Sequence, residues 1–161
     1  MSKPARNLRL SDEEILRRMQ DVQYSYAPGD PKALEALTER IVEAGRKRGL
    51  LTYSDLVRAI EFKLPNVNGG QPFHIVTQDW QGLHRRIVGD FLAMICRETF
   101  AAGKFMGSAL VVGKSSSMPS TFFFEWMEIL QVLPDQQEDT VLAFWADQVR
   151  KAHAYYARDN S

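Results

Sequence analysis

The chain has 161 residues, a formal net charge of zero, 45% hydrophobic residues and 25% charged residues. This length suits one domain with one sizeable core, and the composition excludes a disordered chain. We therefore expect a single domain over residues 1–161, with the helix and turn of residues 1–30 at its periphery. No run of about 18 apolar residues is present, so we expect no contact with a membrane.

The number of cysteines and the first six residues indicate where in the cell to expect the protein. Cys96 is the only cysteine, and residues 1–6 lead into charges rather than into an apolar signal. One cysteine forms no internal disulfide and no cysteine-based metal cluster within one chain. We expect a cytoplasmic protein with no metal and no cofactor.

Charge is unevenly distributed along the chain. Residues 1–115 hold 17 Lys or Arg against 13 Asp or Glu, and residues 116–161 hold 3 against 7. Chance and the placement of charges at helix ends explain a charge difference of this size. The alternative is an acidic C-terminal third that engages a partner.

The first fifty residues predict two helices. A capping box begins at Ser11 and opens a helix over residues 12–23, because a hydroxyl and a carboxylate each satisfy a free amide. The pair Pro28-Gly29 then favours a turn. Asp30 caps a second helix that runs to about residue 48, where Gly49 is the expected stop. Its buried row is Leu34, Leu37, Ile41 and Ala44.

Residues 51–76 predict a short helix, a loop and a short strand. The stretch Thr52-Tyr53-Ser54-Asp55 is similar to a second capping box. Two helices joined by a tight glycine turn resemble the first half of a helix-turn-helix. Residues 63–72 are rich in proline, asparagine and glycine, which indicates a loop. We expect residues 73–76 to form a strand.

The longest predicted element is a central helix over residues 78–102, which Gly103 ends. Its apolar residues form two adjacent rows, as is typical of a helix with a wide buried face; the rows are Leu83, Ile87, Phe91 and Ile95, and Val88, Leu92 and Cys96. Residues 108–112 are the best strand candidate, because they are short, end in two valines and lie between glycines.

The C-terminal third predicts two more helices. The first covers residues 121–133 and ends before Pro134, with an apolar row of Phe122, Trp126, Ile129 and Leu133. The second runs to about residue 157, and its seam is Leu142, Trp145, Val149, Ala152 and Tyr156. This seam either closes the core of one chain or pairs two chains. Together the elements predict a mainly α fold (α+β with a small β element), with five to six helices around one core.

The sequence contains no recognisable catalytic motif. Cys96 shares its row with Val88 and Leu92, which indicates a packed core thiol rather than a nucleophile. The histidines His74, His84 and His153 include no pair at the i, i+4 spacing that places two metal ligands on one helix face. An enzyme whose residues converge only in space is an alternative, for which the first polar set to inspect is Ser108, Ser115, His84 and Glu125.

Short motifs between residues 46 and 119 resemble a known family. Residues 51–56 read Leu-Thr-Tyr-Ser-Asp-Leu, residues 86–92 read Arg-Ile-Val-Gly-Asp-Phe-Leu, and Leu110-Val111-Val112 follow. These stretches are similar to a helix opening with a Thr-Tyr step and to the Arg-Ala-Val-Gly recognition helix in the winged-helix DNA-binding part of the alkyltransferase and alkyltransferase-like family. The resemblance covers less than half of the chain and implies a winged-helix-like centre.

One departure from that family decides what the resemblance implies. Where the family has its Pro-Cys-His-Arg nucleophile motif, this chain has Gly107-Ser108-Ala109-Leu110. The alkyl-accepting cysteine and its histidine partner are both absent from this position, so the resemblance implies no alkyl transfer. What it implies is binding of duplex nucleic acid, because phosphate contacts from basic side chains supply most of the nonspecific affinity.

The predicted nucleic-acid-binding residues are Arg46, Lys47, Arg48, Tyr53, Arg85, Arg86 and Lys114. The zero net charge counts against this hypothesis, since nucleic-acid binders are usually basic on the relevant face. The leading hypothesis is a non-catalytic, winged-helix-like nucleic-acid-binding or regulatory module. The alternatives are a helical protein that binds a protein partner or another copy of itself, and an enzyme with a site that sequence does not reveal.

Overall fold

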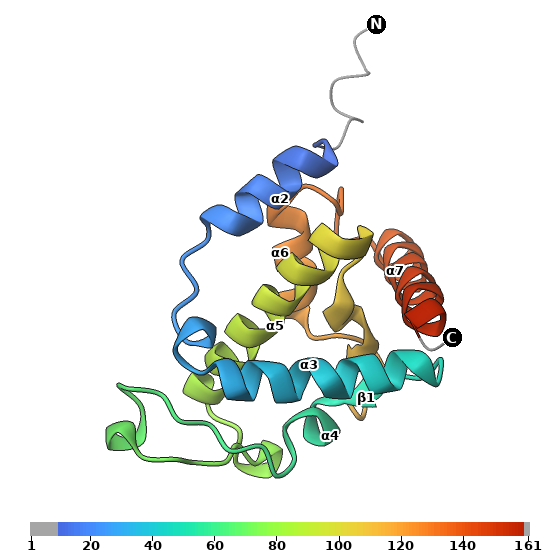
Figure 1. Cartoon of the computed structure of the whole chain (residues 1–161). Coiled ribbons are helices and arrows are strands. Elements are labelled where there is room, and N and C mark those ends of the chain that lie inside the picture. The colour runs from blue at the N-terminus through green and yellow to red at the C-terminus, as the bar shows by residue number, and fades with distance from the viewer. Residues whose placement is uncertain (1–9, 160–161) are drawn as a thin grey trace, which may run out of the picture.

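The computed structural model describes residues 10–159, and the structural statements below concern these residues. They form six helices and one small parallel sheet, which confirms the predicted mainly α fold with a small β element (Figure 1). No helix in this range is long and apolar enough to cross a membrane. The elements are α2 (Asp12–Asp21), α3 (Pro31–Arg46), β1 (Leu51–Thr52), α4 (Tyr53–Val57), α5 (Gly82–Gly103), β2 (Val111–Val112), α6 (Thr121–Ile129) and α7 (Glu138–Asp159).

Helices α2 and α3 begin as their caps predict. The Ser11 hydroxyl accepts a hydrogen bond from the amide of Glu14, and the Asp30 carboxylate accepts one from the amide of Ala33. The end of α3 differs from the prediction, because Arg48 and not Gly49 adopts the left-handed conformation, with φ of 55°. The amide of Gly49 then bonds to a carbonyl in the last turn of α3, which closes the helix.

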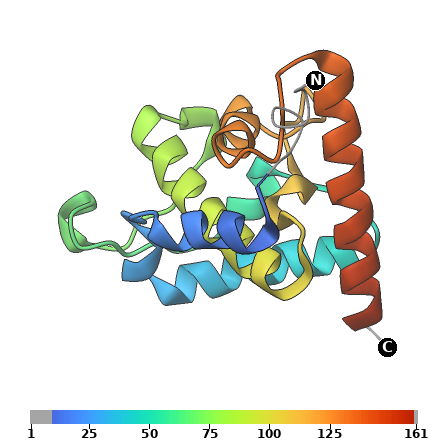
Figure 2. The ribbon, with the colours of Figure 1, turned by 90° about the horizontal axis from the view of Figure 1, so that it is seen from above.

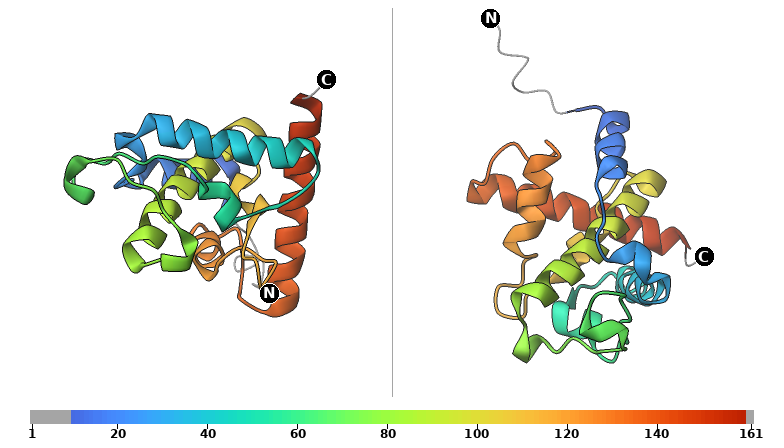
Figure 3. Two further views of the ribbon diagram at one scale, coloured as in Figure 1. Left: turned by 90° about the horizontal axis from the view of Figure 1, so that it is seen from below. Right: turned by 90° about the vertical axis from the view of Figure 1, so that its left-hand side faces the viewer.

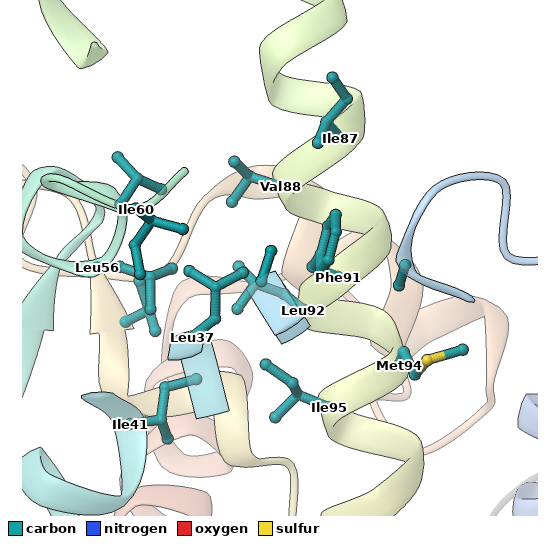
Figure 4. Packing of buried hydrophobic residues seen from close by; sticks show 14 of the residues in the cluster. Leu37, Ile41, Leu56, Ile60, Ile87, Val88, Phe91, Leu92, Met94 and Ile95 are labelled. Atoms are coloured by element: carbon teal, nitrogen blue, oxygen red, sulfur yellow. The ribbon is translucent and has the colours of Figure 1, made fainter. Parts of the chain in front are cut away.

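The central helix α5 packs its predicted apolar rows against α3 and α4. Ile87, Val88, Phe91 and Ile95 are all buried, and Figure 4 shows this face turned toward Leu37, Ile41, Leu56 and Ile60. The helix starts at Gly82, four residues later than predicted, because residues 77–79 form a separate 3₁₀ turn and Gln81 has an extended backbone.

A second group of buried side chains lies against the C-terminal half of α5. Cys96 and Phe100 pack there with residues from α2, α6 and α7. Buried members from α2 and α6 include Ile15, Met19, Phe124 and Met127. The predicted single core is therefore two packed clusters that share α5. Figure 2 shows α5 passing between α3 and α2 on one side and α6 on the other. Helix α2 contributes two fully buried side chains to this cluster. Residues 1–9 of the segment expected to be peripheral lie outside the described range.

Both predicted strands are shorter than expected. Phe73 forms only one antiparallel bridge with Phe62, because the His74 side chain donates to the Ile60 carbonyl, which the next ladder bond would use. Residues 107–110 form a 3₁₀ turn, in which the Gly107 amide bonds to the Thr99 hydroxyl and the Ala109 amide to the Met106 carbonyl, so only Val111–Val112 remain as β2. Strand β2 pairs in parallel with β1, with Leu51 opposite Val111.

The predicted buried row of α6 is wrong at Phe122 and Ile129, although Leu133 is buried as predicted and Trp126 is partly buried. Phe122 and Ile129 are 60% and 65% exposed, whereas Phe123, Phe124, Met127 and Leu130 are buried. Three consecutive phenylalanines allow two registers of the apolar row, and the packed register is the second. The helix ends at Ile129 because Gln131 adopts φ of 62°, which α-helix does not permit.

The seam of α7 packs inside the chain. Ala152 and Tyr156 are buried, and the Trp145 indole donates a hydrogen bond to the Ala109 carbonyl over 2.8 Å. Figure 3 shows α7 passing the C-terminal end of α3. Leu142 is the exception at 50% exposure. The seam therefore closes the core of one chain, and pairing with a second chain or a protein partner stays a prediction for other surfaces.

Tyr24 lies in the segment between α2 and α3, and the pKa of its phenol depends on how closely this segment is packed. Burial raises the pKa of Tyr24 to about 12, opposed by the Arg97 guanidinium, which lies 5.2 Å from the ring centroid. The folded pKa exceeds the unfolded value of about 10, so this stabilisation is complete below pH ~10 and is lost as the pH rises toward 12. We expect the unfolding free energy of Tyr24→Phe to fall less steeply than that of the parent across this range in urea titrations. Equal slopes would mean that the phenol is solvated.

Candidate functional site

A pocket of about 240 Å³ opens between α5, α6 and the start of α4. Its buried wall comes mainly from apolar side chains of α5 and α6, among them Leu92 and Phe123, together with Cys96 and Ser108. Its exposed lining residues are Arg85, Arg86, Gly89 and Phe122. The pocket is therefore an apolar hollow, and the side chains of Arg85 and Arg86 are part of its exposed lining.

Arg85 and Arg86 are exposed and form no ion pair with any carboxylate in the described part of the chain. Other arginines differ: Arg58, for example, binds Asp55 over 2.7 Å. The Arg85 guanidinium lies over the Trp80 ring, 5.8 Å from its centroid, where the ring face attracts a cation without cancelling its charge. Two adjacent positive charges are thus left without an ion-pair partner at the start of α5.

Tyr53 is held rigidly at the side of this pocket. Its hydroxyl oxygen accepts a hydrogen bond from the Ser120 amide over 2.8 Å, and its ring meets Trp80 edge-on with centroids 6.3 Å apart. Burial raises the pKa of Tyr53, while the hydrogen bond from Ser120 acts in the opposite direction. The tyrosine therefore joins the start of α4 to the start of α6 as a neutral phenol.

The deep polar atoms of the pocket satisfy each other. The Cys96 sulfur and the Ser108 hydroxyl are 3.1 Å apart and hydrogen-bonded. Burial raises the pKa of the Cys96 thiol, although the hydrogen bond with Ser108 lowers it. A neutral, buried thiol is a poor nucleophile, so the prediction of a packed core thiol is confirmed.

Trp126 contributes a polar atom that sequence reasoning missed. Its indole nitrogen is buried and has no hydrogen-bond partner within the described residues, although the residue lines the pocket. A buried donor without a partner costs about 1–3 kcal/mol and is rare in folded proteins. In the sequence this tryptophan is one member of an apolar row, so no sequence signal distinguishes it from an ordinary core residue.

The other predicted binding residues lie elsewhere. Arg46, Lys47 and Arg48 are at the C-terminal end of α3, on the opposite side of the molecule from the start of α5 in Figures 1 and 2. Arg48 lines a second pocket, of about 360 Å³, with residues of α7. Lys114 lies in the turn after β2 and lines neither pocket. The structure brings together Tyr53, Arg85 and Arg86 only.

The polar set proposed for an unseen enzyme does not converge. Ser108 lines the first pocket, but Ser115, His84 and Glu125 do not. The His84 ring instead accepts a hydrogen bond from the Gln81 amide at the start of α5. Within residues 10–159 no group of three or more His, Cys, Asp or Glu side chains is arranged to hold a metal ion.

Comparison with protein-family models, curated proteins and solved structures gives no match.

Proposed function

We propose that this chain is a non-catalytic module that binds duplex nucleic acid through the surface at the start of α5. One observation carries the proposal: Arg85 and Arg86 are adjacent, exposed and without a carboxylate partner, beside the pocket that Tyr53 also lines. Guanidinium groups suit phosphate oxygens because their donors form a planar fork. The first turn of α5 adds the positive end of a helix dipole to the same surface.

Local charge matters more here than the net charge of zero. Two acidic residues on α4 and α5 are occupied, because Asp55 pairs with Arg58 and the Asp90 carboxylate binds backbone amides. Asp79, just before α5, is the exposed acidic residue that opposes the two arginines. Phosphate attraction depends on the field at the contact, since interactions beyond a Debye length of about 10 Å are screened. A neutral chain with this distribution still presents a positive patch.

The family resemblance supports the same surface. Tyr53 belongs to the Thr-Tyr motif and Arg86 to the Arg-Ile-Val-Gly motif, two stretches that are separated in the sequence. Both residues line one pocket in the folded chain. The winged-helix-like centre that the resemblance implies stays a prediction.

The test compares duplex binding by the parent and by an Arg85→Gln/Arg86→Gln variant. Binding is measured through the fluorescence anisotropy of a labelled 20-base-pair duplex at 25 to 200 mM KCl. We expect salt-dependent binding by the parent. The variant should bind at least ~10-fold more weakly at low salt, and the slope of log K against log [KCl] should fall by about 1.8, or 0.9 for each lost phosphate contact.

The matched control is Arg48→Gln/Lys63→Gln, which removes two exposed cations that do not line the first pocket. It should keep the affinity of the parent within about twofold, because distant surface charges are screened. Loss of binding in both double variants would show that net charge, and not the α5 surface, controls association. Absence of binding by the parent at 25 mM KCl would refute the proposal.

A further inference from the structure

The first pocket contains more room than its own side chains need. Gly89 lies in the lining, and a methyl group added there would meet no atom within 4 Å. An engineered cavity of about 150 Å³ lined by apolar residues holds benzene. The volume of about 240 Å³ here therefore has room for a second fused ring.

The lining defines the chemistry of an occupant. The walls are apolar side chains, including Leu92, Phe122 and Phe123, which suit a flat hydrocarbon body. The deep hydroxyl and thiol are already bonded to each other, which leaves the Trp126 indole nitrogen as the unpartnered polar atom of the wall. Arg85 and Arg86 belong to the exposed lining and form no ion pair within the described residues, so their guanidinium groups are available to an anionic group at one end of the molecule.

Two further observations distinguish this pocket from the one beside α7. Phe122 leaves 60% of its surface exposed at the first pocket, an unusual position for a phenylalanine in a packed helix. In the second pocket the charge is partly compensated, because Arg150 pairs with Asp147 and His153 bonds to the Gly49 carbonyl. The second pocket also has an exposed arginine, Arg48, beside apolar side chains, so a variant of Arg48 is needed to distinguish the two pockets.

We propose that the pocket between α5 and α6 binds a small, flat, aromatic carboxylate, with its rings against Leu92 and Phe123 and its carboxylate on Arg85 and Arg86. The orphaned Trp126 indole nitrogen belongs to the same wall. The site does not depend on the proposed nucleic-acid function, since small-molecule binding needs no duplex.

The experiment uses 2-naphthoate as the probe and 2-naphthamide as its neutral isostere, each titrated into the full chain by isothermal calorimetry without nucleic acid. Tryptophan fluorescence gives a second readout, because Trp80 and Trp126 lie beside or in the pocket. For a ligand of this size we expect a Kd on the order of 100 µM for 2-naphthoate. The amide should bind about tenfold more weakly, since it lacks the charge that the arginines recognise.

Two variants assign the binding to this pocket. Gly89→Leu fills the hollow while improving the helix propensity of α5, so it should abolish binding of both probes without unfolding the chain. Arg85→Gln/Arg86→Gln should weaken 2-naphthoate about tenfold and leave 2-naphthamide unchanged. The control Arg48→Gln/Lys63→Gln should bind both probes as the parent does.

Three outcomes would overturn the assignment. They are no heat and no fluorescence change with 2-naphthoate up to 2 mM, equal binding of 2-naphthoate by Gly89→Leu and the parent, or loss of binding in Arg48→Gln/Lys63→Gln, which would move the site to the second pocket. The helical circular dichroism signal of Gly89→Leu verifies that this variant is folded. Because these titrations contain no duplex, their failure leaves the nucleic-acid experiment unaffected.

Discussion

An Asp90→Ala variant is expected to lose about 3 kcal/mol of unfolding free energy, since hydrogen bonds to a charged group contribute about 1.5–3 kcal/mol each and exposed amides regain water. The Asp90 carboxylate on α5 accepts hydrogen bonds from the amides of Ser25, Tyr26 and Ala27 over 2.9, 2.8 and 2.8 Å. These bonds hold the connection between α2 and α3 against α5 (Figure 1). Urea denaturation followed by circular dichroism measures the loss.

Two companion variants separate this tether from a general charge effect. Asp90→Asn keeps one acceptor oxygen and should retain part of the stability. Asp79→Ala removes an exposed carboxylate for which no contact is present, and surface substitutions of this kind change stability by about 0.5 kcal/mol or less. If Asp90→Ala were as stable as Asp79→Ala, the three hydrogen bonds would not fix the N-terminal segment.

A Gly45→Ala variant is expected to lose about 2 kcal/mol, the difference between an overpacking cost of up to about 3 kcal/mol and a gain of about 1 kcal/mol in helix propensity. Helices α3 and α7 meet at this residue. A Cβ added to Gly45 would overlap the ring of Tyr156 and lie 2.8 Å from its Cγ. That ring is buried and packs edge-on against Phe105, with centroids 5.5 Å apart, so it has little freedom to move.

Gly89→Ala is the matched control for this contact. Gly45 lies in the last turn of α3 and Gly89 inside α5, where the position of a Cβ is open. The control should gain about 0.5–1 kcal/mol, because alanine is favoured over glycine in a helix. Thermal and urea denaturation of both variants give the comparison. A stabilised Gly45→Ala would contradict the close packing of α3 on α7.

Local patterns in the sequence predict most of the helices correctly. Caps at Ser11, Asp30 and Thr52 and the apolar rows of α3 and α5 depend on neighbours three or four residues away, so periodicity reveals them. The same reasoning fails for α6, where consecutive phenylalanines fit two registers and only tertiary packing selects one. Residues 73–76 fail as a strand because a side chain takes a ladder acceptor.

The candidate site is only partly predictable for a related reason. The motif resemblance selects Tyr53 and Arg86 separately, and nothing local says that they line one pocket. Arg46 to Arg48 form an equally basic stretch in the sequence, yet the direction of α3 places them at the other side of the molecule. Asp90 belongs to the same motif as Arg86, but its partners are 63 to 65 residues away. Long-range contacts of this kind leave no periodic signal.

The central claim is that the start of α5, with Tyr53, forms the binding surface of this chain. The most direct measurement is a titration of the ¹⁵N-labelled chain with the 20-base-pair duplex at 25 mM KCl, followed through amide chemical shifts. The account predicts the largest shifts at Tyr53, Arg85 and Arg86, and unchanged amides at Arg46, Lys47 and Arg48. Largest shifts at the end of α3, or no shifts anywhere, would contradict it.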